Sequence, residues 1–186
     1  EVCGEAGSAR EGLDKVLALK PDLVVVDLTL PDKSGLELLK DIQAMVPGMT
    51  CLVLSMHDES LYAERVLRAG ARGYLMKETA AENLITAIRK VFTGGLYVSE
   101  SLAAKMLEQL ALGRPKQAGG GVDALTDREL EVLEAIGAGK ATKIIAEQLS
   151  ISARTVEAHR AHIKEKLNIT DGSSLVRFAV QWVESR

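Results

Sequence analysis

Three short apolar runs, each followed by sequence with a helical pattern, constrain the fold of this chain more than any other feature. The runs are "LVVVDL" (23–28), "CLVLS" (51–55) and "GYLMK" (73–77). Strands that alternate with helices predict βαβ units and a parallel sheet with helices on both faces. Three consecutive valines are typical of a strand that is buried on both faces. We therefore expect a doubly wound α/β domain that begins with these segments.

Capping patterns predict where helices begin. In a capping box, a Ser or Thr and a Glu three residues later satisfy free amides of the first helical turn. Four segments match this pattern, and they begin at Ser8, Ser34, Thr79 and Thr126. A further helix is predicted from about Glu59 to Ala69, with Gly70 ending it. His57 and Asp58 are interpreted as a loop residue and a helix cap.

The pattern changes after about residue 96. "SESLAAKMLEQLALG" predicts a helix that ends at Gly113, and "RPKQAGGG" (114–121) has the composition of a flexible linker. Beyond it the sequence predicts helices alone, over residues 127–137, 142–149, 153–167 and 173–184. We therefore expect three parts: an α/β domain over 1–95, a linker helix and tether over 96–124, and a small all-α domain over 125–186.

Composition excludes several classes of protein. The 186 residues are 47% hydrophobic, which is enough for packed cores and excludes a wholly disordered chain. No apolar run approaches the roughly 18 residues of a membrane-spanning helix, and no signal peptide is recognisable. We therefore expect a cytoplasmic protein without membrane contact, with Cys3 and Cys51 as reduced thiols. A net charge of −3 gives no sign of nucleic-acid binding, so any such surface must be local.

Each of the three predicted strands ends in a polar residue, namely Asp27, Ser55 or Lys77. The carboxyl ends of parallel strands meet at one edge of the sheet, where doubly wound folds bind ligands. A carboxylate is a nucleophile toward phosphorus, a lysine neutralises transferred charge, and a hydroxyl donates to a phosphoryl oxygen. Tyr74 is placed to pack inward when the Ser55 hydroxyl is recruited. This edge is therefore predicted to handle a phosphoryl group.

This set of residues resembles the receiver domain of bacterial response regulators over about residues 1–95. "VVVDLTLP" matches the phospho-acceptor segment, "LVLSMHDES" the segment with the switch hydroxyl, and "GYLMK" the segment with the switch aromatic and the lysine. The resemblance implies a flavodoxin-like fold with Asp27 as phospho-acceptor. It implies Ser55, Tyr74 and Lys77 as switch and phosphate-contacting residues. It also implies a Mg²⁺ cofactor, held by the Asp27 carboxylate and the backbone carbonyl of Thr29.

The opening segment "EVCGEAG" resembles the second strand of such a domain and the loop after it. A βαβ unit takes roughly 30 residues, and 26 residues precede Asp27. We therefore expect an N-terminally truncated receiver that lacks the first strand and helix. The acidic pair that this strand brings to the magnesium site would be missing with it, and Glu1 and Glu5 are not placed to substitute.

Residues 125–167 resemble the helix-turn-helix of LuxR-type regulators. "LTDRE", "TKIIA" and "SARTV" match its opening, its scaffold helix and the entry to its recognition helix. Together with the receiver, this pattern is typical of the NarL/FixJ class of two-component response regulators. The resemblance implies double-stranded DNA as a partner, a sensor histidine kinase as phosphodonor, and a homodimer.

The helix predicted over 153–167 has two contrasting faces. A repeat of 3.6 residues places one apolar stripe toward the core: Val156, Ile163 and Leu167. The N-terminal part of such a recognition helix contacts base edges. We expect Glu157 to accept from a cytosine amino group, and the small Ala158 and Ala161 to permit close approach. The other predicted DNA contacts are Arg154 on the same face and, to phosphates, Lys143, Thr155, Arg160 and Lys164.

The charge around this helix is locally positive. Residues 140–166 hold six Lys or Arg against three Glu, a surplus of three. This surplus is modest, so binding by one copy should be weak and salt-sensitive, which favours a dimer on two half-sites. His159 borders the apolar stripe and is interpreted as a packed, hydrogen-bonded histidine.

We therefore expect a transcription factor, not an enzyme, in which phosphorylation of Asp27 controls dimerisation and DNA binding. Two alternatives remain open. A degenerate receiver would leave a DNA-binding dimer that does not depend on phosphorylation. A haloacid-dehalogenase-like phosphatase would also form an aspartyl-phosphate, but such enzymes need a second acid near the nucleophile, and Thr29 stands two residues after Asp27.

Overall fold

A computed structural model describes residues 1–111 and 121–185 of the chain. The chain divides into two compact units, Glu1–Arg114 and Pro115–Arg186, and each is described by itself. The predicted tether lies outside the described residues, except for Gly121. The helix before it, α5 (Glu100–Ala111), belongs to the first unit. The predicted domain boundaries at residues 95 and 125 stay predictions.

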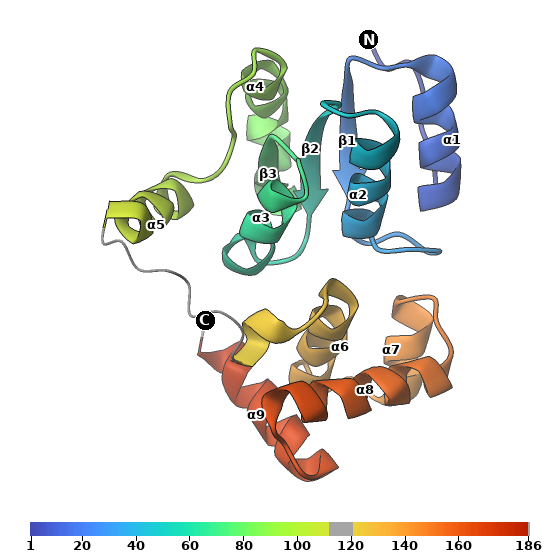
Figure 1. Cartoon of the computed structure of the whole chain (residues 1–186), viewed down its shortest axis with the longest axis vertical. Helices are drawn as coiled ribbons and strands as arrows, with labels where there is room; N and C mark the ends of the chain where they lie inside the picture. The colour runs from blue at the N-terminus through green and yellow to red at the C-terminus, as the bar shows by residue number, and fades with distance from the viewer. Residues whose placement is uncertain (112–120, 186) are drawn as a thin grey trace. The chain divides into compact units, whose positions relative to one another are not determined.

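The first unit alternates helices and strands, as predicted. Its further elements are α1 (Ala9–Leu19), β1 (Leu23–Asp27), α2 (Gly35–Met45), β2 (Thr50–Ser55), α3 (Glu59–Arg68), β3 (Gly73–Met76), the 3-10 turn η1 (Lys77–Thr79) and α4 (Ala80–Phe92). The three strands pair in parallel in the order β1-β2-β3, which Figure 1 shows between its helices. Residues 1–6 form neither helix nor strand, which corrects the expectation of a strand in the opening segment.

Different helices cover the two faces of this sheet. Leu52 and Leu75 form a buried cluster with Ala87 of α4. Successive strand residues point to opposite faces, so Cys51 lies on the other face, where Gln43 of α2 approaches its sulfur to 3.7 Å. Burial raises the pKa of the Cys51 thiol to about 11, which keeps it protonated and unreactive.

The prediction that the first strand is buried on both faces is wrong. Val26 is buried, whereas Val25 is 42% exposed. The register pairs Val25 with Leu52 and so places it on the face that α4 covers. However, β1 forms one edge of the sheet, and α4 packs on β2 and β3. Helix α4 therefore does not cover Val25. A continuous apolar run in the sequence cannot reveal which strand lies at the edge of a sheet.

The predicted capping boxes form only in part. Thr126 and Glu129 complete one, because each side chain accepts from the backbone amide of the other. Ser8 Oγ accepts from the amide of Glu11, but the Glu11 carboxylate accepts from the amide of residue 7 instead of returning to Ser8. Two of the predicted residues make no capping hydrogen bond through their side chains: Ser34 and Thr79.

The second unit is all-helical, as predicted. Its elements are the 3-10 turn η2 (Gly121–Ala124), α6 (Asp127–Gly137), α7 (Thr142–Gln148), α8 (Ala153–Leu167) and α9 (Gly172–Glu184). All four helices contribute to its core, which includes these fully buried residues: Val132 of α6, Ile145 of α7, Val156 and Ile163 of α8, and Leu175 of α9. Helices α6 and α9 approach closely because Gly137 has no side chain; a Cβ there would lie 2.5 Å from the carbonyl oxygen of Ala179.

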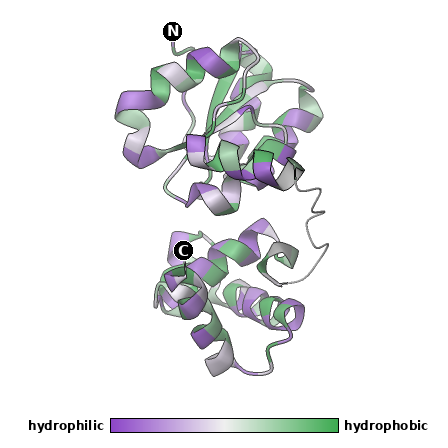
Figure 2. Cartoon of the chain, turned by 90° about the vertical axis from the view of Figure 1, so that its left-hand side faces the viewer, coloured by the Kyte–Doolittle hydropathy of each residue, from purple (hydrophilic) through white to green (hydrophobic). Residues whose placement is uncertain are grey.

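Hydropathy follows the same organisation in both units. Hydrophilic and hydrophobic residues interleave along the helices in Figure 2, as helices with one buried face require. Within residues 1–111 and 121–185, no helix is both long enough and apolar enough to cross a membrane.

Candidate functional site

The first candidate site lies at the carboxyl edge of the sheet. Asp27 ends β1, and its Oδ2 accepts a hydrogen bond from Lys77 Nζ at 2.5 Å, although 50 residues separate the two. The strand register pairs Asp27 with Leu54 and Ser55 with Met76; Asp27 and Ser55 therefore end neighbouring strands, and Lys77 directly follows the third. The side chains of Asp27 and Lys77 are 30% and 35% exposed. The carboxylate is therefore charge-paired and still accessible to an incoming group.

Ser55 and Tyr74 are connected through the backbone of His57. The buried Ser55 Oγ accepts from the His57 amide at 3.0 Å, and the Tyr74 hydroxyl donates to the His57 carbonyl at 2.7 Å. As an acceptor in this bond, the Ser55 hydroxyl keeps its own proton for a further partner. Tyr74 is 1% exposed. It therefore already holds the inward position that the sequence analysis expected on recruitment of Ser55.

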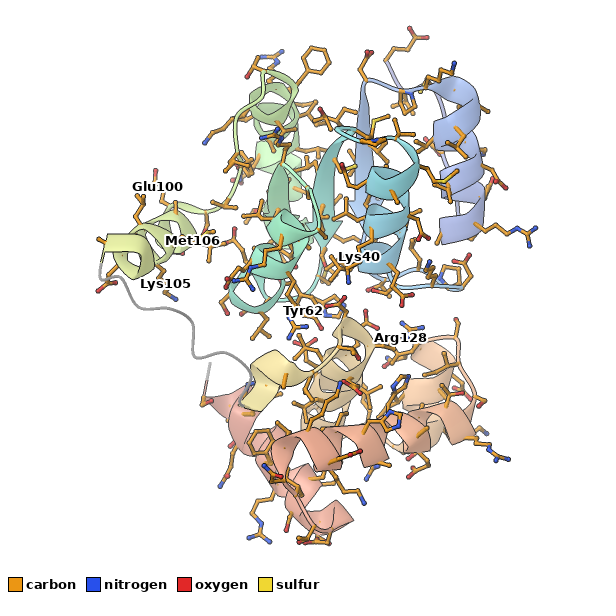
Figure 3. The ribbon with its side chains drawn as sticks, in the orientation of Figure 1. Lys40, Tyr62, Glu100, Lys105, Met106 and Arg128 are labelled. Atoms are coloured by element: carbon orange, nitrogen blue, oxygen red, sulfur yellow. The ribbon has the colours of Figure 1, made fainter. Side chains whose placement is uncertain are left out.

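His57 is a site residue that the sequence analysis missed, because it was interpreted as a loop residue. Its Nε2 lies 3.3 Å from Thr29 Oγ1, and its ring packs on Tyr62 of α3 with 4.7 Å between ring centroids. Figure 3 labels Tyr62 on this helix. The Thr29 amide in turn donates to Asp27 Oδ1 at 3.0 Å. These contacts join the loops after β1 and β2 beside the predicted phospho-acceptor. The position two residues after Ser55 was the only signal in the sequence.

Gly35 fixes the loop that follows Asp27. Its amide donates to the Leu28 carbonyl at 2.8 Å. A Cβ at this position would lie 1.9 Å from the carbonyl oxygen of Asp27, so no residue with a side chain fits. The same loop is held at Asp32, whose carboxylate accepts from the amide of Ala9 at the start of α1. Backbone hydrogen bonds from this helix end hold the pKa of Asp32 below its usual value.

Two of the described residues are the predicted ligands of a magnesium ion. Asp27 offers a carboxylate, and Thr29 is the residue predicted to add a backbone carbonyl. The Asp32 carboxylate accepts from two amides of α1. Across the described parts of the chain, no three or more His, Cys, Asp or Glu side chains are grouped to hold a metal ion. Mg²⁺ usually keeps several water ligands and is bound through one or two carboxylates, and its ligation by Asp27 and Thr29 stays a prediction.

The second candidate site is the outer face of α8 together with the start of α7. Val156 and Ile163 are buried, as predicted, so the opposite side of the helix faces outward. The helix begins at a cap in which Ser152 Oγ accepts from the Thr155 amide at 3.0 Å. Most predicted DNA contacts are exposed: Lys143, Arg154, Thr155, Glu157, Ala158 and Ala161. Two more are half-buried: Arg160 and Lys164.

Glu157 has two partners on this face. Thr142, the first residue of α7, donates from Oγ1 to Glu157 Oε1 at 2.9 Å. Arg160 Nε lies 3.7 Å from Glu157 Oε2. The Glu157 side chain is 59% exposed, whereas that of Arg160 is 19% exposed. Arg160 is therefore largely covered and directed toward a carboxylate, and its predicted contact with a phosphate stays a prediction.

An ion pair between Lys166 and the buried Glu129 fixes α8 on α6. Lys166 Nζ donates to Glu129 Oε2 at 2.6 Å, and the Glu129 side chain is nearly fully buried. Burial raises the pKa of Glu129, but hydrogen bonds from Lys166 and Thr126 outweigh this effect and hold the pKa below its usual value. The positive surplus counted over 140–166 thus includes a lysine that is engaged with α6. The outer face of α8 carries less positive charge than the sequence count predicts.

Two family models match the chain. The model described as "Response regulator receiver domain" matches residues 1–89, and "Bacterial regulatory proteins, luxR family" matches residues 123–179. The oxygen regulatory protein NreC of Staphylococcus carnosus (strain TM300) is 36% identical over 185 residues, which cover 97% of this chain and 85% of that protein. The chain is a LuxR-family response regulator.

Other relatives agree with this assignment. The transcriptional regulatory protein UhpA of Escherichia coli (strain K12) is 39% identical over 177 residues, covering 95% of this response regulator and 83% of UhpA. A LuxR-family two-component response regulator from Aurantimonas sp. SI85-9A1 has a TM-score of 0.54 at 32% identity, over 59% of this chain and 79% of that one.

RcsB from Salmonella enterica serovar Typhimurium, bound to the promoter rprA in the presence of the phosphomimetic BeF3-, has a TM-score of 0.57 at 23% identity. The match covers 97% of this response regulator and 85% of RcsB, and it shows the fold alone. The predicted family and the predicted combination of a receiver with a LuxR-type helical domain are confirmed.

Proposed function

We propose that this response regulator is a transcription factor whose DNA binding is controlled by phosphorylation of Asp27. One observation carries the proposal: an accessible carboxylate at the carboxyl edge of a parallel sheet is paired with Lys77 at 2.5 Å. A phosphoryl group brings negative charge to this point, and a fixed ammonium balances that charge during transfer. The relatives NreC and UhpA, named as regulatory proteins, support the same function.

In the proposed reaction, a sensor histidine kinase supplies a phosphohistidine. A carboxylate oxygen of Asp27 attacks the phosphorus, and the bond between phosphorus and the imidazole nitrogen breaks. The electron pair stays on that nitrogen, and the product is an acyl phosphate on Asp27. Lys77 then pairs with one phosphoryl oxygen, and the Ser55 hydroxyl donates a hydrogen bond to another phosphoryl oxygen. Receiver domains use Mg²⁺ for this transfer, and we propose the Asp27 carboxylate and the Thr29 carbonyl as its ligands in this chain.

Phosphorylation would change the first unit through the segment after β2. The amide of His57 is held by Ser55, and its carbonyl is held by Tyr74. Two residues later α3 begins at Glu59, whose Oε1 accepts from the amide of Ser99 at 2.8 Å, just before α5. Recruitment of the Ser55 hydroxyl therefore acts on a segment that is connected to the helix leading out of the unit. The effect is a shift of population between two states.

The second unit supplies the proposed DNA contacts. We place α8 in the major groove, with Arg154, Glu157, Ala158 and Ala161 toward the bases. Lys143, Thr155, Arg160 and Lys164 are assigned to phosphates. Because the local positive charge is modest, one copy should bind weakly, and a homodimer on two half-sites gives the needed affinity. With DNA as its partner, the protein is expected in the cytoplasm.

The two alternative functions are less well supported. A phosphatase of the haloacid-dehalogenase type needs an acid close after its nucleophile, but Thr29 occupies that position with its hydroxyl toward His57. A phosphorylation-independent dimer would not need the pairing of Asp27 with Lys77, which is intact. The relatives NreC and UhpA are named as regulatory proteins, which agrees with the proposed function.

The proposal is tested with a small phosphodonor and a pool of random-sequence duplexes. Acetyl phosphate should label the wild-type protein at Asp27 and raise its affinity for the selected duplexes by about tenfold, a usual size for such coupling. Asp27→Asn should bind equally with and without the donor. Asp22→Asn, at an exposed position just before β1, should behave as wild type. Donor-stimulated binding by Asp27→Asn would exclude Asp27 as the acceptor, and absence of DNA binding by wild type would exclude the function.

A further inference from the structure

The outer face of α8 carries an exposed glutamate that a residue of another helix holds in place. Glu157 accepts from Thr142 at 2.9 Å and lies 3.7 Å from the Arg160 guanidinium, while more than half of its side chain remains exposed. A solvent-exposed glutamate on a helix ordinarily samples several rotamers. Here a neutral donor on α7 and a largely covered cation on α8 restrict it. The carboxylate therefore points outward in a defined direction.

The pair is not needed to hold α7 against α8. The two helices already share the apolar core through Ile145 and Val156, which are fully buried. An exposed hydrogen bond adds little to such packing. Its main consequence is the orientation of the carboxylate, which still has acceptor capacity on both oxygens.

We propose that Thr142 is a positioning residue that directs Glu157 toward a cytosine amino group, so that this pair selects cytosine at one position of each half-site. The inference rests on the proposed role of α8 as the DNA-reading helix. A carboxylate accepts hydrogen bonds and donates none. In the major groove, cytosine and adenine alone present amino donors, and the adenine amino group lies beside the N7 acceptor, which repels a second carboxylate oxygen. The small side chains of Ala158 and Ala161 leave the approach to the base open.

The inference predicts a specificity effect that is separable from affinity. Binding sites are first selected from random-sequence duplexes with acetyl-phosphate-treated protein. Dissociation constants are then measured for four duplexes that differ at one base pair. Wild type should prefer cytosine by about tenfold, the usual order for one base pair. Thr142→Val, which removes the hydroxyl and keeps the shape, should reduce the preference to roughly threefold, and Glu157→Gln should abolish it.

Two further variants separate positioning from structure. Thr142→Ser keeps a hydroxyl and should retain the preference for cytosine. Thr155→Val also removes a hydroxyl, but that hydroxyl contacts Ser152 at 2.8 Å. This variant should therefore weaken binding to all four duplexes by the same factor. If Thr142→Val weakens binding to the four duplexes by the same factor, the inference is overturned in favour of a structural role for Thr142. An unchanged preference in Thr142→Val or in Glu157→Gln would also overturn it. Wild-type protein that binds no duplex would instead overturn the proposed function itself.

Discussion

The two candidate sites are built in opposite ways. At the edge of the sheet, Asp27 and Ser55 end two strands and Lys77 directly follows a third; Lys77 donates to Asp27, and Ser55 accepts from an amide of the loop after β2. On the second unit, the proposed contacts come from α8 and the start of α7, and most of them face solvent. The first arrangement suits a reaction at one atom, whereas the second suits a binding surface whose contacts form only with the bound DNA. Backbone geometry should therefore dominate the first site, and side-chain charge and direction the second.

The largest expected effect comes from adding one methyl group at two comparable glycines. Gly35 and Gly172 each begin a helix, α2 and α9. A Cβ at Gly35 would lie 1.9 Å from a backbone oxygen, whereas a Cβ at Gly172 meets nothing within 4 Å. Gly35→Ala should lower the free energy of unfolding by about 3 kcal/mol, the upper part of the range for overpacking. Gly172→Ala should raise it by roughly 0.5 kcal/mol, because it restricts the unfolded chain.

Intrinsic fluorescence separates the two units in urea unfolding. All three tyrosines lie in the first unit, at positions 62, 74 and 97, and the single tryptophan, Trp182, packs against the core of the second. Gly35→Ala should shift the tyrosine transition and prevent labelling of Asp27 by acetyl phosphate. Gly172→Ala should affect the tryptophan transition alone. If Gly35→Ala, like Gly172→Ala, retains the wild-type stability of the first unit, backbone geometry does not control the loop that follows Asp27.

A smaller effect is expected from Lys77→Met, which removes charge at the first site and leaves the backbone unchanged. The rate of Asp27 labelling by acetyl phosphate should fall about 100-fold, as when one charge-stabilising donor is lost at a reacting oxygen. Stability should change by less than about 1 kcal/mol, because the pair is about one-third exposed and screened by solvent.

Lys105→Met on the exposed side of α5 is the matched control for this charge change; the residue is labelled in Figure 3. It should label at the wild-type rate. Gel retardation of the phosphorylated form over time measures both rates. Equal rates for Lys77→Met and wild type would mean that the observed ion pair is structural and takes no part in transfer.

Sequence reasoning reached the parts of each site that depend on regular repeats. Asp27, Ser55 and Lys77 were predictable because parallel strands end at one edge, and the buried stripe of α8 followed from the helical period. Val25 was not predictable, because the residues of a strand do not reveal whether it lies at the edge of its sheet. Gly35 likewise depends on a close backbone approach that its own sequence neighbours do not show.

Contacts between elements were the other part that the sequence could not supply. His57 meets Thr29 across two loops, and Thr142 meets Glu157 across two helices. Taken alone, His57 and Thr142 have ordinary interpretations as a loop residue and a helix residue. Their roles depend on how the segments cross, and that is determined by the packing of the cores rather than by local patterns.

The smallest expected effect is a pH dependence in the stability of the second unit, which arises beneath α8. His159 is half-buried there, and burial lowers its pKa; Glu129 opposes this effect, while Arg128 and His162 add to it. The unfolded chain therefore takes up a proton near pH 6.5 that the folded unit takes up only at lower pH. Since the unfolded state binds more protons in this window, the second unit should lose stability as the pH falls below about 6.5. Glu129, whose pKa is also lowered, extends the loss in the same direction below about pH 4.5.

Urea unfolding followed by Trp182 fluorescence at pH 7.5 and 5.5 measures this dependence in the full chain. His159→Gln should flatten the change between the two pH values, because it removes the group whose protonation differs between folded and unfolded states. His162→Gln, at a position whose side chain is 62% exposed, should leave most of it in place. If the stability changes equally between the two pH values in wild type and in His159→Gln, another group is responsible for the pH dependence. A flattened dependence would show that a neutral, packed His159 supports α8 in addition to the ion pair of Lys166 with Glu129.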